Sequence, residues 1–92
     1  MPVTLTPSAL IARRIPAGWQ ACVGAQLKDR RRAKHVTIEN LAAVIGCSKN
    51  HVVKLERGEA SLQAIVYACA ALGVDPSTVI RDAWAVARKV QR

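Results

Sequence analysis

The side chains best suited to chemistry lie between residues 48 and 57, where basic and amide side chains alternate with aliphatic ones. On a helix, Val52 and Leu55 share one face and are expected to point inward. The opposite face then carries Lys49, Asn50, Lys54 and Arg57. An apolar back and a basic, amide-bearing front suit a helix that lies in the major groove of DNA.

Candidates for catalysis or metal binding are few. The three cysteines and two histidines form no C-x-x-C or H-x-x-x-H spacing, so the sequence predicts no zinc site. Asp29 and Glu39 have no second carboxylate at catalytic spacing, and no glycine-rich phosphate loop occurs. We therefore expect a protein that is not an enzyme and that needs neither a metal nor another cofactor.

Two helices joined by a tight turn are expected to position the basic face. Thr37 is a suitable N-cap, and Gly46 ends the first helix because glycine adopts the left-handed conformation without steric cost. Ser48 caps the second helix and Gly58 closes it. The inward face of the first helix is formed by Ile38, Leu41, Ala42 and Ile45.

Three further helices are expected around this pair. One runs from about Trp19 to Lys34, and the next starts after the Ser61 N-cap and stops at Gly73. The last covers about Pro76–Val90, with proline at its first position. In the helix after Ser61, the residues at helical spacing that are expected to close the core are Leu62, Ile65, Val66 and Cys69.

Composition and charge limit the class of protein. The chain of 92 residues is 51% hydrophobic but has no phenylalanine, so aliphatic residues must fill a single modest core. Residues 1–57 carry ten Lys/Arg against three Asp/Glu, whereas residues 58–92 carry four against three. This positive excess favours a polyanionic partner. With no apolar run of 18 residues, no secretory signal and an odd number of cysteines, a cytoplasmic protein without a membrane partner is expected.

This set of features resembles the phage-repressor (Cro/repressor) family of helix-turn-helix DNA-binding proteins over roughly residues 23–80. The resemblance rests on Thr37, Leu41-Ala42, Ile45-Gly46, Ser48, Val52, Leu55 and Glu56-Arg57-Gly58, with Leu27 and Arg31 before them and Ala71-Leu72-Gly73 after them. It implies an all-α, five-helix repressor-like DNA-binding domain over residues 19–92. Residues 1–18 form either a short helix starting near Thr6-Pro7 or a loose arm, whose Arg13 and Arg14 suit phosphates or a minor groove.

The resemblance also implies roles for individual residues. The positions that read bases hold Lys49, Asn50 and Lys54, and the apolar contact to a thymine methyl would come from Val53. The positions that touch the DNA backbone hold Ser48, His51 and Arg57, and the helix before them adds Arg30 and Arg32. Cys47 stands at an apolar turn position and is expected to pack inward. Arg31 and Glu56 match an ion pair that is structural in the family.

The last helix is expected to carry an interface. Its broad apolar stripe consists of Val79, Ile80, Ala83, Trp84, Ala87 and Val90, of which only part can cover the core. A surplus tryptophan suits a contact between subunits, and members of the resembled family often dimerise through this region. We therefore expect a homodimer formed through Trp84, Ile80 and Ala87, bound to double-stranded DNA with inverted-repeat half-sites.

Two departures from the resembled family leave two functions open. Ile38 stands where the family usually has a glutamine, and Val44 and Val53 stand at positions that are normally polar. Together Ile38, Val44 and Val53 would form an apolar patch for another regulatory protein. The basic front favours a dimeric transcriptional repressor of a phage, plasmid or other mobile element. The patch favours an anti-activator or antitoxin-like protein that sequesters another regulator.

Overall fold

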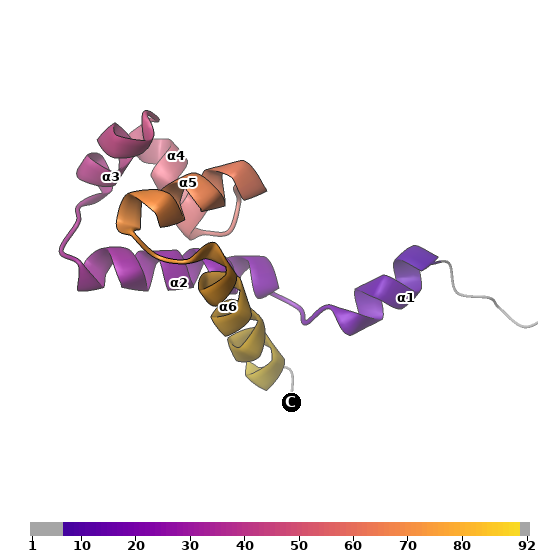
Figure 1. Cartoon of the computed structure of the whole chain (residues 1–92). Coiled ribbons are helices and arrows are strands. Elements are labelled where there is room, and N and C mark those ends of the chain that lie inside the picture. Colours follow the sequence, from indigo (N-terminus) through magenta and orange to yellow (C-terminus); the bar gives the residue numbers. More distant parts are fainter. Residues whose placement is uncertain (1–6, 91–92) are drawn as a thin grey trace, which may run out of the picture.

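The computed structural model describes residues 7–90, and six α-helices account for the regular structure in that range (Figure 1). The helices are α1 (Pro7–Arg14), α2 (Trp19–Ala33), α3 (Ile38–Ile45), α4 (Lys49–Glu56), α5 (Leu62–Leu72) and α6 (Pro76–Val90). The expected all-α class is confirmed, and of the two alternatives for the N-terminal segment, a short helix or an arm, the structure has the helix α1. The proposed cap of α1 at Thr6 lies outside the described residues.

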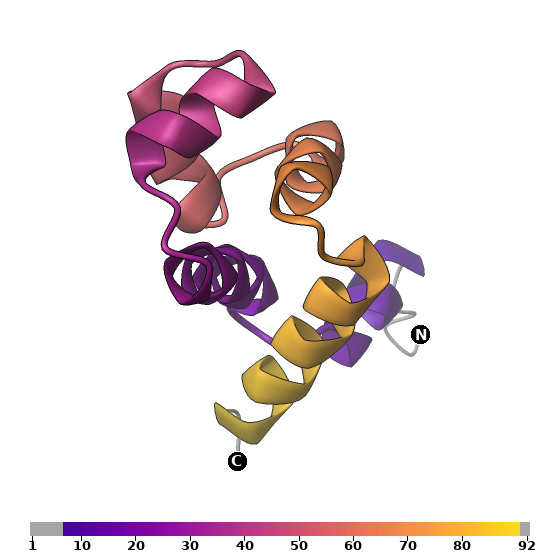
Figure 2. The ribbon, with the colours of Figure 1, turned by 60° about the vertical axis from the view of Figure 1, so that its left-hand side comes forward.

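Helix α2 is the element against which the rest of the domain packs. Helices α4, α5 and α6 all contact it, with α6 making the most extensive contact. Figure 1 shows α3, α4 and α5 above α2, and α6 crossing α2 and running downward from it, and Figure 2 shows the same helices from another side. The main core cluster joins α2, α4, α5 and α6 through Val23, Leu27, Leu55, Ala68, Cys69, Val79 and Ala83. A second cluster joins α3, α4 and α5 through Leu41, Ala42, Val52 and Leu72.

Side-chain caps and glycines fix the ends of the helices as expected. The hydroxyls of Thr37, Ser48 and Ser61 accept hydrogen bonds from backbone N–H groups three residues later, at 3.0, 3.1 and 3.2 Å. Gly46 adopts a left-handed conformation with φ of 82° at the end of α3, and Gly73 does so with φ of 67° at the end of α5. These local signals therefore determine where α3, α4 and α5 start and where α3 and α5 stop.

The buried face of α5 differs from the expected one. Cys69 is buried, but Leu62 is 66% exposed and Val66 is 39% exposed. The core is instead closed by Ala68, Cys69 and Leu72. Ten of the eleven residues of α5 are apolar, so several faces satisfy the helical spacing and the sequence could not select one.

No single helix within residues 7–90 is long and apolar enough to cross a membrane. Helices α5 and α6 reach the required length and composition only as a pair, and their axes bend by 112° at the break between them. Both helices also contribute buried side chains to the main core cluster.

Candidate nucleic-acid interface

The polar face of α4 is presented outward by the packing of its apolar face. Val52 and Leu55 are 0% and 1% exposed and anchor α4 in the two core clusters. The side chains expected at bases or at the DNA backbone that remain exposed are Ser48, Lys49, Asn50, His51, Lys54 and Arg57. Val53 is half-buried, so less of it is free for a thymine methyl. This arrangement gives α4 a projecting polar front on a fixed apolar back.

An ion pair links the first turn of α3 to the first turn of α4. Lys49 Nζ lies 3.0 Å from Glu39 Oε1, and both side chains are more than half exposed. The free backbone N–H at Glu39 and the Lys49 ammonium hold the pKa of Glu39 below its usual value. Glu39 is a neighbour of the site that was not expected from the sequence. The sequence signal for this pair is that Glu39 lies two residues after the Thr37 N-cap and Lys49 lies one residue after the Ser48 N-cap.

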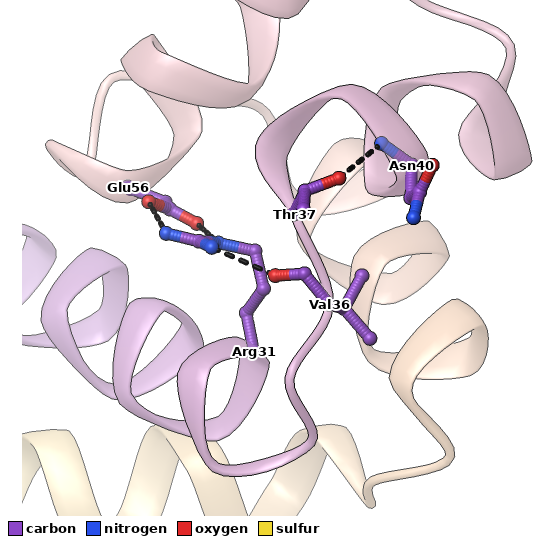
Figure 3. A network of polar contacts seen from close by, with 5 residues as sticks. All are labelled: Arg31, Val36, Thr37, Asn40 and Glu56. Carbon is purple, nitrogen blue, oxygen red and sulfur yellow. Dashed lines mark hydrogen bonds and ion pairs between the residues drawn. The ribbon is translucent and has the colours of Figure 1, made fainter.

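A buried ion pair fixes α4 to α2. Arg31 donates through Nε to Glu56 Oε2 at 2.6 Å and through a terminal nitrogen to Glu56 Oε1 at 3.2 Å (Figure 3). The other terminal nitrogen donates to the carbonyl oxygen of Val36 at 2.8 Å. The two side chains are only 8% and 7% exposed, and the hydrogen bond with Glu56 raises the pKa of Arg31. The pair thus holds α4 and the α2–α3 connection in one arrangement.

The two arginines expected at phosphates separate onto different sides of α2. Arg30 donates to Asp82 Oδ2 of α6 at 2.9 Å and to Gln26, so it faces α6 and not the side of α3 and α4. The pair with Asp82 therefore competes with the phosphate contact expected of Arg30, which stays a prediction. Arg32 lines a shallow groove of about 300 Å³ together with Lys28, Arg57, Ile38 and Val53. Lys28 of α2 adds another basic side chain to this groove beside α4.

The three residues expected to form one apolar patch lie in two places. Ile38 and Val53 line the groove beside Arg32, where both are half-buried. Val44 is 70% exposed and borders a different hollow, of about 440 Å³, with Ile45, Tyr67 and Ala70. The prediction of a single apolar patch is therefore wrong. Ile38 and Val44 are six residues apart on α3, a spacing that turns them to different faces.

The three residues expected at a dimer contact also differ in their surroundings. Trp84 and Ile80 are half-buried and line an apolar cleft with Trp19. Ala87 is only 1% exposed, so it packs within its own subunit and cannot contact another copy. The expectation for Ala87 is wrong, because the stripe on α6 is wide enough for its centre to face the core while Ile80 and Trp84 form its edge.

Metal-binding chemistry does not gather anywhere in the part of the chain that the structure describes. No group of three or more His, Cys, Asp or Glu side chains within residues 7–90 is placed to hold an ion. Cys47 is half-buried and packs against the second core cluster beside Ile38 and Ile45. Burial raises the pKa of the Cys69 thiol, which keeps that side chain in its neutral form.

Comparison with known families decides how this arrangement is classified. A family model described as a helix-turn-helix domain matches residues 23–80, from the first turns of α2 into α6. The chain belongs to the helix-turn-helix domain family. Helix α3, the turn at Gly46 and helix α4 form the helix-turn-helix itself, and α1 lies outside the matched range. A comparison with curated proteins found no match.

Proposed function

We propose that this helix-turn-helix protein is a sequence-specific, double-stranded DNA-binding transcriptional regulator that acts as a repressor. The observation that carries the proposal is the exposed Lys49, Asn50 and Lys54 on an α4 whose opposite face is fully buried. A helix held in this way can enter the major groove without loss of packing. The resemblance to the phage-repressor (Cro/repressor) type supports a role in a phage, plasmid or other mobile element.

Base recognition in this proposal belongs to the outward side chains of α4. Lysine donates to the guanine O6 and N7 atoms, and asparagine pairs with the N6 and N7 atoms of adenine. Glu39 holds the Lys49 ammonium at 3.0 Å above the first turn of α4. Lys49 therefore approaches the groove from a defined position, and its ion pair must open or adjust when it meets a base.

Backbone contacts belong to the cationic rim beside α4. Lys28 and Arg32 of α2 border the same groove as Arg57, which follows the end of α4. Ser48 and His51 are exposed at the start of α4 and are suited to phosphate hydrogen bonds. Such contacts fix the orientation of the domain on the duplex but carry no sequence information.

The experiment that tests this function is selection from a pool of random duplexes by the full-length protein. Enrichment of an inverted repeat is expected, because the proposed protein is a homodimer with one α4 per half-site. The matched control is a protein with both Lys49→Ala and Asn50→Ala, which should enrich no motif. A pool that remains unenriched with the unaltered protein would contradict the proposal.

A second candidate function, sequestration of another regulator, is favoured by one observation. Val44 and Tyr67 are 70% and 52% exposed around the hollow between α3 and α5, and they leave apolar surface uncovered. Val44→Lys tests this candidate because it should abolish a protein partnership there and leave DNA binding intact. Ile38→Gln is the matched change in the groove that Ile38 lines with Arg32 and Val53. Regulation in cells that survives Lys49→Ala with Asn50→Ala but is lost with Val44→Lys would favour sequestration.

A further inference from the structure

An apolar cleft of about 320 Å³ opens between the start of α2, the start of α5 and the middle of α6. Its apolar lining consists of Trp19, Val23, Ala60, Leu62, Ile65, Ile80 and Trp84. The ring centroids of Trp19 and Trp84 are 6.2 Å apart with the planes tilted by 50°. Leu62, at the cleft, is 66% exposed. Aromatic and aliphatic surface gathered in one hollow is typical of a place where another molecule binds.

Helix α1 is the one element of the described chain that lacks a packing partner. None of the other five helices packs along it, and Figure 1 shows it projecting beyond the first residue of α2. Its Ile11 is 59% exposed. An isolated helix shorter than about 12–15 residues is marginal in water, and α1 has eight. A stable α1 therefore needs an apolar surface that its own domain does not supply.

The connection between α1 and α2 keeps α1 away from the cleft of its own chain. Pro16 is buried in this connection, and Gly18 adopts a left-handed conformation with φ of 76°. The connection borders a separate hollow whose other wall includes Arg57 and Glu59. Proline restricts its own φ, and the left-handed Gly18 sets the direction in which the chain enters α2, so the connection resists folding α1 back over Trp19. Occupation of the cleft by the same chain is therefore disfavoured.

We propose that α1 of a second copy occupies the cleft, with its Ile11 against Trp19 and Trp84, in a reciprocal exchange about a two-fold axis. Each chain carries both an uncovered helix and an uncovered cleft. A two-fold dimer therefore covers both helices and fills both clefts at once.

This exchange deepens the homodimer of the proposed function by naming the segment that joins the subunits, and it requires no DNA. The chain has two tryptophans, and both line the cleft. Tryptophan emission therefore reports directly whether the cleft is filled. Emission should shift to shorter wavelength with rising protein concentration, in step with the dimer fraction measured by sedimentation equilibrium.

The test compares two variants of the full chain that each place a charge on an exposed aliphatic residue. Ile11→Asp should raise the dimer dissociation constant at least tenfold and keep the emission of the monomer at every concentration. Val44→Asp is the matched control, because Val44 is 70% exposed on α3 and borders a different hollow. It should dimerise and emit like the unaltered protein. Thermal melting of the dilute proteins checks that both variants remain folded.

A photo-crosslinking phenylalanine derivative in place of Ile11 separates exchange from folding back. In a mixture of isotopically light and heavy chains, cross-links should join light to heavy peptides containing residues 58–65 or 80–84. Cross-links confined to one chain, a protein that stays monomeric, or a dimer that withstands Ile11→Asp would each overturn the proposal. Loss of DNA binding alone would bear on the proposed function and leave this result unchanged.

Discussion

Two of the residues proposed to recognise bases lie in the first turn of α4. Lys49 and Asn50 are exposed there, while Val52, in the same helix, is completely buried. The double change Lys49→Ala with Asn50→Ala should therefore leave the melting temperature unchanged. Preference for the selected operator over a scrambled duplex should fall by about 1–3 kcal/mol for each lost bidentate contact. Competition binding at fixed salt measures this preference.

The control for that experiment removes one charge far from α4. Lys89→Ala on α6 lowers the net charge by one, as the double variant does, and Lys89 is exposed. It should retain full operator preference. The double variant should still bind any duplex weakly and in a salt-sensitive way, through Arg32 and Arg57. Equal preference in the double variant and the unaltered protein would exclude Lys49 and Asn50 as base-reading residues.

The buried pair of Arg31 and Glu56 is expected to be essential for stability. Glu56→Ala leaves the Arg31 guanidinium, which is 8% exposed, with only the Val36 carbonyl as a partner. Breaking a buried pair in this way costs about 3–5 kcal/mol, so the free energy of unfolding in urea should fall by that amount. Glu39→Gln breaks an ion pair that is more than half exposed and should leave unfolding nearly unchanged. Similar unfolding of Glu56→Ala and the unaltered protein would show that the pair is not structural.

At the scale of elements, the approach of α4 to α2 depends on a glycine. A Cβ atom built at Gly24 would lie 2.6 Å from the backbone nitrogen of Gly58 and would also overlap the backbone at Glu56. Backbone atoms cannot move aside as a flexible side chain can, so Gly24→Ala must push the end of α4 away from α2. We expect the melting temperature to fall strongly, and DNA affinity to fall with it as α4 tilts.

Gly46→Ala provides the comparison for Gly24→Ala. Gly46 has φ of 82° with nothing within 4 Å of its built Cβ, so alanine there costs only the left-handed conformation, about 1–2 kcal/mol. Thermal melts of the two variants therefore distinguish the stability lost through backbone overlap from the stability lost through an unfavourable backbone conformation. If Gly24→Ala is no more destabilising than Gly46→Ala, the close approach of the two helices does not limit the fold.

Local signals and long-range packing were predictable from the sequence to different degrees. Thr37, Ser48 and Ser61 cap their own helices, so the sequence alone placed α3, α4 and α5. The contact of Arg30 with Asp82 joins residues 52 positions apart, and no local pattern encodes it. The split of Ile38 from Val44 depends on how α3 sits against α5. Which face of a helix each residue occupies could therefore be determined only from the packed structure.

At the scale of the whole molecule, positive charge gathers on the half of the chain that carries the helix-turn-helix. Lys28, Arg32 and Arg57 form the cationic rim beside α4, so the proposed dimer would present six such side chains to phosphates. Log affinity should fall with log salt at a slope of about −5, since each neutralised phosphate contributes about −0.9. Arg57→Ala should reduce the steepness by about two units in the dimer. Titrations between low and moderate salt measure the slope, and an unchanged slope would remove Arg57 from the interface.

The spacing of half-sites tests the dimer and the DNA interface together. Two α4 helices related by a two-fold axis enter successive major grooves on one face of the duplex, roughly 10 base pairs apart. Inserting five base pairs between the half-sites rotates one of them to the opposite face. Affinity should then fall to that of a single half-site, because one subunit loses its base contacts while the other keeps them. Direct binding titrations on the parent, inserted and single half-site duplexes measure this loss.

The comparison among those duplexes separates a dimer from two independent monomers. Independent monomers would bind the inserted duplex as well as the parent, since each needs only its own half-site. The Ile11→Asp protein provides the matched case, because a dimer joined through α1 and the cleft of Trp19 and Trp84 would be lost in that variant. It should bind parent and inserted duplexes equally, at the affinity of one half-site. Insensitivity of the unaltered protein to the insertion would mean that each α4 reads DNA alone.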